Sequence, residues 1–261
     1  MPPVPKPPTA KSGRNRTLLI ALAVAAVVAA GLIGASLLRS SGDDGDSAAT
    51  TAATETTGTT DTTAGGTTSP AVTLVAGIPQ RGTVLGKSGT TVRMLQFEDI
   101  QCPICKQYTD DAFPAIVNEY VRPGRLKIDF RGLAFLGPDS LKALKIAMAA
   151  GLQNKLWEVV GLFYENQGAE NSGWVTDSLI NQILADVPGL DAAQVKVDAQ
   201  SATIANRIAA IQAEATKLEV QGTPWFYLAV GFNPPVNFQP STLTPSEFRT
   251  PIDQALQAGS P

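Results

Sequence analysis

The chain has 261 residues, a net charge of −3 and a pI near 5.1. Its Lys and Arg residues beyond residue 71 are scattered, so the sequence lacks the basic surface that phosphate backbones require, and nucleic acid is not an expected partner. The chain contains no histidine, which excludes the usual general base, the commonest metal ligand and Ser-His or Cys-His nucleophiles. Only two cysteines are present, Cys102 and Cys105.

An uncharged run of mainly Leu, Ile, Val and Ala occupies residues 17–38 and is long enough to cross a hydrocarbon core of about 30 Å. Basic residues precede this run, and several aspartates follow it. The positive-inside rule therefore places residues 1–16 in the cytoplasm and everything after residue 38 outside. The alternatives are a buried helix of a soluble domain and a cleaved signal peptide, whose apolar stretch is shorter. We expect an uncleaved, single-pass membrane anchor.

Residues 39–70 contain little beyond Thr, Ser, Ala, Gly and Asp. Such a composition cannot bury enough apolar surface to offset the entropy of ordering the chain, so it predicts a disordered linker. Residues 71–261 remain as one folded domain outside the membrane.

This domain alternates strand and helix patterns, which predicts an α/β fold. Residues 92–97 read as a buried strand, 126–130 alternate at period two, and 225–230 resume a strand. Residues 103–121 between the first two strands predict a helix. Pro114 should bend this helix because it removes one backbone hydrogen bond.

A long helical pattern covers residues 138–221 and predicts a helical insertion between two halves of the sheet. The last helix of the insertion has an apolar stripe at helical spacing, formed by Ile204, Ile208, Ile211, Ala215 and Leu218. The closing helix is expected to begin with a capping box, Thr244-Pro245-Ser246-Glu247, although Pro251 lies inside it.

The two cysteines form a Cys-x-x-Cys pair where the first strand gives way to a helix. Cys102 is expected at the helix N-terminus, where unpaired amides and the helix dipole stabilise a thiolate, so we expect it to be the exposed nucleophile. Cys105, one turn later, should be more buried and should resolve a mixed disulfide. Pro103 suits the first helical turn because its missing N–H is not needed there.

Two other uses of the cysteine pair are open. A zinc or iron-sulfur site needs about four ligands, which this chain could complete only with carboxylates or a second chain. A static disulfide across two residues would restrain little of the unfolded state. Redox chemistry is the favoured interpretation, and it calls for no metal and no cofactor.

A second segment, Gly222-Thr223-Pro224, stands between a helix and a strand and is similar to the cis-proline loop of thioredoxin-like proteins. With it, the chain resembles the DsbA-like thioredoxin-fold family from about residue 85 through the last helix. The other motifs that carry this resemblance are Asp99-Ile100-Gln101-Cys102-Pro103-Ile104-Cys105, Gly137-Pro138-Asp139-Ser140 and Gln153-Asn154-Lys155-Leu156-Trp157-Glu158.

The resemblance implies a thioredoxin-like α/β fold with a five-membered sheet core and an inserted helical domain. It also implies disulfide exchange with exported polypeptides, whose main chain would pair beside Thr223 and Pro224. The electrons would leave through a membrane reoxidant of the DsbB or vitamin K epoxide reductase-like type.

The chain departs from the family pattern at two positions that tune the redox pair. Ile104 occupies the place of the histidine in Cys-Pro-His-Cys relatives and cannot hydrogen-bond a thiolate. Gln96 stands where the family often carries a buried acid and cannot shuttle a proton. Glu98 or Asp99 could substitute, but two adjacent acids at a strand end are more often solvated, and we expect that here. The three tryptophans are expected to pack, with only Trp225 near a peptide groove.

The sequence therefore predicts an extracytoplasmic thiol-disulfide oxidoreductase that oxidises exported thiols. Alternatives are a reductase or isomerase of the same fold, and a tethered chaperone or binding module whose disulfide never turns over.

Overall fold

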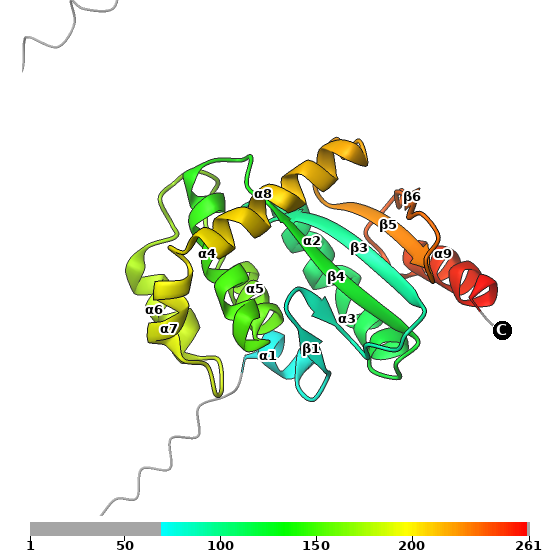
Figure 1. Cartoon of the computed structure of the whole chain (residues 1–261), viewed down its shortest axis with the longest axis horizontal. Coiled ribbons are helices and arrows are strands. Elements are labelled where there is room, and N and C mark those ends of the chain that lie inside the picture. Colours follow the sequence, from blue (N-terminus) through cyan, green and yellow to red (C-terminus); the bar gives the residue numbers. More distant parts are fainter. Residues whose placement is uncertain (1–68, 260–261) are drawn as a thin grey trace, which may run out of the picture. The chain divides into compact units, whose positions relative to one another are not determined.

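The computed structural model describes residues 69–259 (Figure 1). Its strands form a six-stranded sheet in the order β1-β2-β4-β3-β5-β6. The strands are β1 (Gln80–Arg81), β2 (Val84–Leu85), β3 (Val92–Asp99), β4 (Leu126–Leu133), β5 (Trp225–Val230) and β6 (Val236–Phe238). The three predicted strands are confirmed. The sheet has six strands, so the five-membered sheet is wrong by one. The short strands β1, β2 and β6 were not predicted; β1 and β2 extend the edge beside β4, and β6 extends the edge beside β5.

Strands β3 and β4 form the parallel centre of the sheet, and the other neighbouring pairs are antiparallel. Both central strands are almost wholly buried, although β4 alternates apolar residues with Lys127, Asp129 and Arg131. A parallel pair needs a crossover connection, and the helical segment after β3 provides it.

Helices cover the sheet and form a separate group at one end of the domain (Figure 1). In the figure, α4 to α7 gather at the left, while α8 packs on β4 and α9 on β5. The helices are α1 (Pro70–Val75), α2 (Pro103–Asp111), α3 (Phe113–Ile116), α4 (Pro138–Ala150), α5 (Leu156–Glu165), α6 (Asp177–Ala185), α7 (Ala192–Asp198), α8 (Ala202–Lys217) and α9 (Pro245–Ala258), with a π-helical turn η1 (Val117–Val121) and a 3-10 turn η2 (Gly151–Gln153).

The predicted helix over 103–121 is a broken one. Helix α2 ends before Ala112, whose φ of −104° departs from helical values, and α3 restarts with Pro114 in its first turn. Proline lacks the N–H that would bond four residues back and its ring crowds that carbonyl, so the break falls beside it. A π-helical turn then completes the segment.

The predicted helical insertion is confirmed, and it consists of α4 to α8. The stripe of α8 packs inward: Ile204, Ile211 and Ala215 are buried, and Ile208 and Leu218 lie partly buried against the core.

The capping box of the closing helix is wrong, although α9 does begin at Pro245 and continues through Pro251. The Thr244 hydroxyl bonds the Ser246 hydroxyl, and the Glu247 carboxylate accepts from the N–H of Ser241. The side chains of Thr244 and Glu247 therefore do not form the predicted pair of hydrogen bonds with the backbone N–H groups at the helix start.

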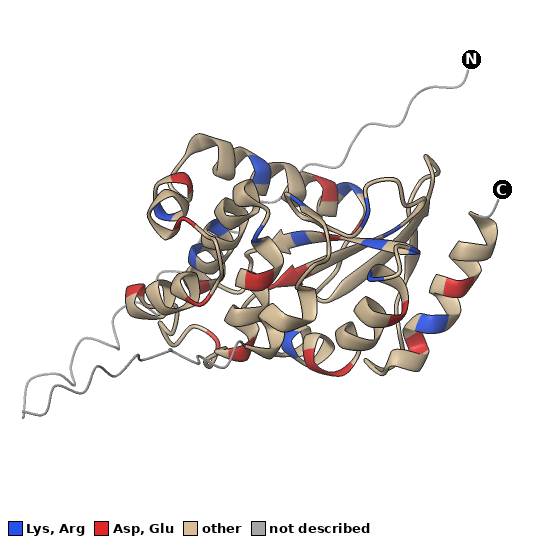
Figure 2. Cartoon of the chain, turned by 90° about the horizontal axis from the view of Figure 1, so that it is seen from below, with Lys and Arg blue, Asp and Glu red and all other residues tan. Residues whose placement is uncertain are grey.

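The sequence placed the domain boundary at residue 71, but α1 begins at Pro70 with Ser69 as its N-cap. The predicted cytoplasmic tail, the membrane anchor over 17–38 and nearly all of the linker lie outside the described residues. Within 69–259, no helix is both long and apolar enough to cross a membrane. Acidic and basic residues are interspersed over the described helices and strands (Figure 2).

Candidate active site

The cysteine pair lies at the junction of β3 and α2, as the sequence predicted. Cys102 is the N-cap of α2, and Pro103 takes the first helical position. The Cys102 N–H donates to the Asp99 carbonyl at 2.9 Å, which closes the turn between strand and helix, and Lys106 N–H donates to the Cys102 carbonyl at 3.1 Å. The Cys102 side chain is thus held beside the free amides of the first helical turn.

Both cysteines are free thiols, and Cys102 is more buried than expected. Cys105 is 0% exposed and Cys102 only 7% exposed, so the prediction of an exposed Cys102 is wrong. The loop before β5 provides the cover, because the Thr223 carbonyl lies 3.3 Å from the Cys102 sulfur. Cys102 is still the more accessible of the two sulfurs.

Hydrogen bonding lowers the pKa of the Cys102 thiol from 9.0 to about 6. The largest cause is the Cys105 thiol, which donates to the Cys102 thiolate, and burial opposes it. The Thr223 side chain and the backbone N–H groups of Cys105 and Ile104 add further donors. The Thr223 carbonyl can only accept and so favours the thiol form, but the donors outnumber it. Cys102 is therefore largely thiolate at neutral pH.

Burial raises the pKa of Cys105 well above its ordinary value, and the thiolate of Cys102 and the nearby Glu98 carboxyl add to the effect. The pKa of the Cys102 thiol is thus lowered, whereas that of the Cys105 thiol is raised. Cys102 can therefore attack a disulfide, or leave one, as a thiolate, whereas Cys105 holds its proton.

The loop that covers Cys102 has the predicted cis peptide bond, between Thr223 and Pro224. The fold brings this loop to Cys102 across more than a hundred residues of sequence, because β5 pairs with β3. Ile104 is 49% exposed, so its apolar side chain faces solvent in the first turn of α2, while its N–H donates to the Cys102 thiolate. Trp225, the first residue of β5, lies partly buried beside the loop.

Glu98 and Asp99 are both buried, so the expectation that they are solvated is wrong. Glu98 is 1% exposed and lies on β3 beneath the cysteine pair. Its carboxylate accepts from the Tyr164 hydroxyl at 2.6 Å and from the Gln96 amide at 2.5 Å, and the Tyr108 hydroxyl donates to Gln96 at 3.0 Å. Tyr164 lies 66 positions further along the chain, so no local pattern indicates its hydrogen bond with Glu98.

Burial raises the pKa of Glu98 from 4.5 to about 8, against the lowering effect of the Tyr164 hydroxyl, and the Cys102 charge raises it further. A carboxyl with this pKa can take up and release a proton near neutral pH. Glu98 can therefore titrate near neutral pH, whereas the amide of Gln96 cannot.

The Asp99 carboxylate, unlike that of Glu98, hydrogen-bonds only to backbone N–H groups of two loops. It accepts from the N–H of Gln101 at 2.9 Å and from the N–H groups of Phe135 and Leu136 at 3.1 and 3.2 Å. Asp99 therefore ties the loop after β4 to the turn that carries Cys102.

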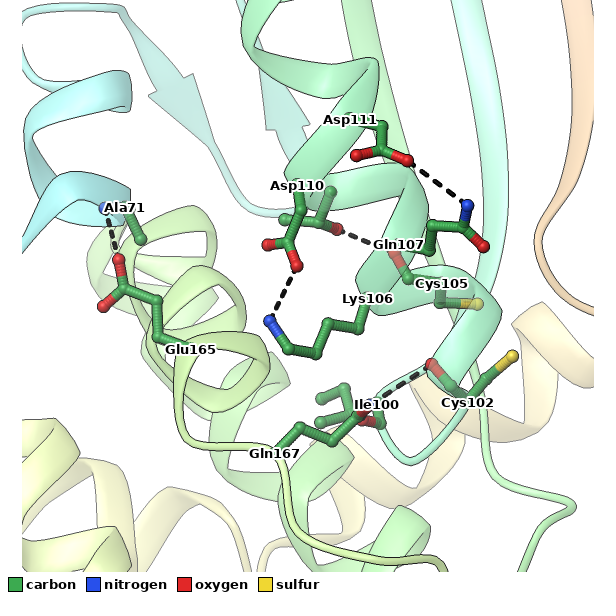
Figure 3. Close-up of polar contacts among 11 residues, drawn as sticks. Ala71, Ile100, Cys102, Cys105, Lys106, Gln107, Asp110, Asp111, Glu165 and Gln167 are labelled. Atoms are coloured by element: carbon green, nitrogen blue, oxygen red, sulfur yellow. Dashed lines mark hydrogen bonds and ion pairs between the residues drawn. The ribbon is translucent and has the colours of Figure 1, made fainter. Parts of the chain in front are cut away.

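The helical insertion also holds this turn. Gln167 donates to the carbonyls of Ile100 and Cys102 at 2.7 and 3.2 Å, and Figure 3 shows its side chain reaching toward them. The Gln101 side chain bonds Ser140 at 2.9 Å and the Asn171 N–H at 2.8 Å. No local pattern in the sequence predicts these contacts, because each joins residues that are distant in the chain.

Two of the predicted packing tryptophans are confirmed as such. Trp157 stacks on Phe113 with ring centroids 5.5 Å apart, and Trp174 meets Phe163 edge to face. Among the residues that the structure describes, no group of three His, Cys, Asp or Glu side chains could hold a metal ion.

Comparison with known proteins bears on this site. Residues 80–230, which include both cysteines and the cis-proline loop, match the thioredoxin family model. A Bacillus cereus protein named "Probable disulfide bond formation protein D" is 30% identical over 147 residues, covering 55% of this chain and 68% of that protein. The chain belongs to the DsbA-like thioredoxin family of thiol-disulfide oxidoreductases.

Two solved structures agree with the fold of this DsbA-like protein. Oxidised BdbD from Bacillus subtilis covers 69% of this chain and 97% of its own, with a TM-score of 0.59 and 22% identity. A thioredoxin-like oxidoreductase from Silicibacter pomeroyi covers 67% of this chain and 91% of its own, with a TM-score of 0.50 and 25% identity.

Proposed function

We propose that this oxidoreductase oxidises cysteine pairs of exported proteins, with Cys102 and Cys105 as its redox pair. The observation that carries the proposal is the opposite tuning of two neighbouring sulfurs at the start of α2. Donors lower the pKa of Cys102, while burial raises that of Cys105. A stabilised thiolate favours the reduced form of the pair, which makes the oxidised form the better oxidant.

In the proposed reaction, a substrate thiolate attacks the Cys102 sulfur of the Cys102–Cys105 disulfide. A mixed disulfide forms, and Cys105 leaves as a thiolate that takes up one proton. The second substrate thiolate then attacks the substrate sulfur and releases the Cys102 thiolate. The substrate gains one disulfide, and the enzyme keeps the two electrons as its dithiol.

Substrate main chain is proposed to bind beside Thr223 and Pro224. The contact of the Thr223 carbonyl with the Cys102 sulfur supports this placement, because a peptide seated there has its cysteine next to the reacting atom. Pro103 and Ile104 are proposed to tune the couple, the first by fixing the helix start and the second by donating its N–H to the Cys102 thiolate.

The dithiol must pass its electrons on before the next turnover. We propose a membrane reoxidant of the DsbB or vitamin K epoxide reductase-like type, reached by a domain that residues 17–38 anchor to the membrane. The apolar run and the charges that flank it support the anchor.

The reduction potential of the full-length protein tests the proposal. Equilibration with glutathione should give a value closer to the about −120 mV of a strong oxidant than to the about −270 mV of thioredoxin. A thioredoxin-like value would make the chain a reductase and contradict the proposed direction.

The proposed topology predicts the behaviour of reporter fusions. Alkaline phosphatase fused after Pro261 should be active, because the basic residues before residue 17 should keep the N-terminus in the cytoplasm. The same fusion in a chain lacking residues 17–38 is the control and should be inactive. An inactive phosphatase, with an active cytoplasmic reporter at the same point, would overturn the location.

The substitution Ile104→His should make the couple more oxidising. A histidine there adds a donor, and at low pH a positive charge, next to the Cys102 thiolate, so the pKa of Cys102 should fall further. Each pKa unit corresponds to about 1.4 kcal/mol, or about 30 mV for this two-electron couple. Thiolate absorbance against pH and glutathione equilibration measure the two quantities.

Ile104→Gln is the control for polarity without charge and should shift both quantities less. A more reducing couple in Ile104→His would show that residue 104 does not act on the sulfur in this way.

A further inference from the structure

The loop that follows α5 in the helical insertion lies against the turn that carries Cys102. The Gln167 side-chain amide donates to the carbonyls of Ile100 and Cys102, at 2.7 and 3.2 Å. Between these two carbonyls, the Gln101 side chain accepts from the Asn171 N–H at 2.8 Å. Three consecutive residues of the turn are therefore held by one loop of the insertion.

The backbone of Gln167 is itself fixed by the end of α5. Its N–H donates to the Tyr164 carbonyl at 3.2 Å, and its side chain is half-buried. A β-carbon on the next residue, Gly168, would stand 2.5 Å from the β-carbon of Trp174, so the loop folds back closely on itself there. Gln167 therefore reaches the turn from a fixed backbone, with its side-chain amide alone.

The carbonyl of Cys102 is coupled to the surroundings of the Cys102 sulfur. Rotation about the Cα–C bond of Cys102, where ψ is 119°, swings the carbonyl and the start of α2 together. This rotation decides which amides of the first helical turn face the sulfur. The backbone N–H groups of Ile104 and Cys105 are donors to the Cys102 thiolate. A donor that holds the Cys102 carbonyl therefore also keeps these two N–H groups on the sulfur.

The hydrogen bonds from Gln167 leave the sulfur itself accessible to a substrate. Figure 3 shows the Cys102 carbonyl directed toward Gln167, while the sulfur points away from it. The sulfur meets the Thr223 carbonyl on its own side, at 3.3 Å. Gln167 can thus act on Cys102 without occupying the space through which a substrate sulfur must approach.

Two donors share the Cys102 carbonyl. Lys106 N–H donates to it at 3.1 Å as the first hydrogen bond of α2, and a carbonyl has lone pairs for both donors. The bond from Lys106 ties the carbonyl to α2, and the bond from Gln167 ties it to the insertion. Neither cysteine belongs to the insertion, so Gln167 is a direct link between the two parts of the domain at the redox pair.

We propose that Gln167 is a positioning residue through which the helical insertion holds Cys102 in its reactive geometry at the start of α2. The inference rests on the proposed function. Without the Gln167 amide, the carbonyls of Ile100 and Cys102 lose their side-chain donor and the turn gains freedom to rotate. The helical N–H groups then align less well with the sulfur, and the thiolate loses stabilisation.

Gln167→Met in the full-length chain tests this role, because methionine is unbranched and of similar length but cannot donate a hydrogen bond. The pKa of Cys102, followed by thiolate absorbance against pH, should rise by about one, which is tenfold in proton affinity. The titratable neighbours Cys105, Glu98 and Tyr164 are present in every variant compared, so their charges act on Cys102 equally.

The redox equilibrium gives a second readout of the same change. When the pKa of Cys102 rises from about 6 to about 7, less thiolate stabilises the dithiol at pH 7. Equilibration of Gln167→Met with glutathione at this pH should therefore move about fivefold toward the Cys102–Cys105 disulfide.

Gln153→Met is the matched control. Gln153 is also half-buried, and its side chain bonds the backbone N–H and carbonyl of Asp191 at 2.9 and 3.1 Å. These bonds join η2 to the start of α7, within the insertion. Gln153→Met should leave the pKa of Cys102 and the glutathione equilibrium unchanged, even where urea unfolding shows that both variants lose stability.

The outcomes separate this inference from the proposed function. An unchanged pKa of Cys102 in a folded Gln167→Met chain, or an equal rise in Gln153→Met, would overturn the positioning role. If Gln167→Met does not fold, Gln167→Ala replaces it, since the shorter side chain admits water and the pKa should again rise. Both readouts need no protein substrate. A wild type that shows them but oxidises no two-cysteine peptide would contradict the proposed function and leave the positioning role intact.

Discussion

Cys102→Ser is expected to abolish the oxidation of a reduced two-cysteine peptide, whereas Cys105→Ser should stop turnover at a mixed disulfide. The reason is the unequal placement of the two sulfurs. Cys102 carries the lowered pKa and the contact with the cis-proline loop, while Cys105 is fully buried. A chain with Cys102 alone keeps its nucleophile but has no second thiol with which to resolve the adduct.

Mass spectrometry of the reaction with glutathione disulfide measures this difference. Cys105→Ser should gain one glutathione that reductant removes, and Cys102→Ser should gain far less in the same time. The double variant is the blank. Undiminished exchange in Cys102→Ser would show that the buried Cys105 is the attacking sulfur and would reverse the assigned roles.

Glu98→Gln is expected to remove a large part of the pH dependence of stability. The pKa of Glu98 is raised from 4.5 to about 8 in the folded protein, chiefly by burial. Below pH 4.5 the Glu98 carboxyl is protonated in both the folded and the unfolded state, so the free energy of unfolding does not depend on pH through this group. From 4.5 to about 8 the folded state keeps a proton that the unfolded state loses, so stability falls as pH rises, and above 8 the penalty is constant. This difference in pKa corresponds to about 5 kcal/mol.

Unfolding by urea between pH 4.5 and 8.5 measures the effect in the oxidised form, where Cys102 and Cys105 do not titrate. The pKa values of Tyr108 and Tyr164, which face the same carboxyl, are raised well above 10 and leave this window clear. The wild type should lose stability across the window, and Glu98→Gln should not. An equal slope in both chains would contradict the burial of an ionisable Glu98.

The two tyrosines provide a matched pair of variants. The Tyr164 hydroxyl donates directly to Glu98 and lowers its pKa, whereas the Tyr108 hydroxyl donates to Gln96. Tyr164→Phe should therefore move the fall in stability to higher pH, and Tyr108→Phe should leave its position nearly unchanged.

The elements that assemble the redox pair could be predicted from the sequence because their signals are local. A buried apolar run followed by Cys-Pro-x-Cys predicts a strand that ends at a helix, and a proline before the next strand marks the second loop. Pairing of β3 with β5 then brings Cys102 and Thr223 together, as the family resemblance implies. The short strands β1 and β2 and helix α1 carry too few residues for a periodic signal.

The burial of Glu98 and Asp99 could not be predicted from the sequence, because burial depends on what packs over a residue. Glu98 and Asp99 look like a solvated strand end, but Tyr164 and the loop after β4 cover them from far along the chain. One signal was available, since residues 96 and 98 share a face of a strand with period two. An acid at position 98 therefore lies on the same face of the strand as the family acid at position 96 would.

Cys102 is proposed to exchange disulfides with exported proteins. The most direct test is to produce the full-length Cys105→Ser chain in its own cells, block free thiols with acid and alkylating agent, and identify the proteins attached to Cys102 by mass spectrometry. We expect reductant-sensitive adducts to cysteines of exported proteins, absent from the Cys102→Ser/Cys105→Ser chain. Adducts with cytoplasmic proteins alone, or none at all, would contradict it.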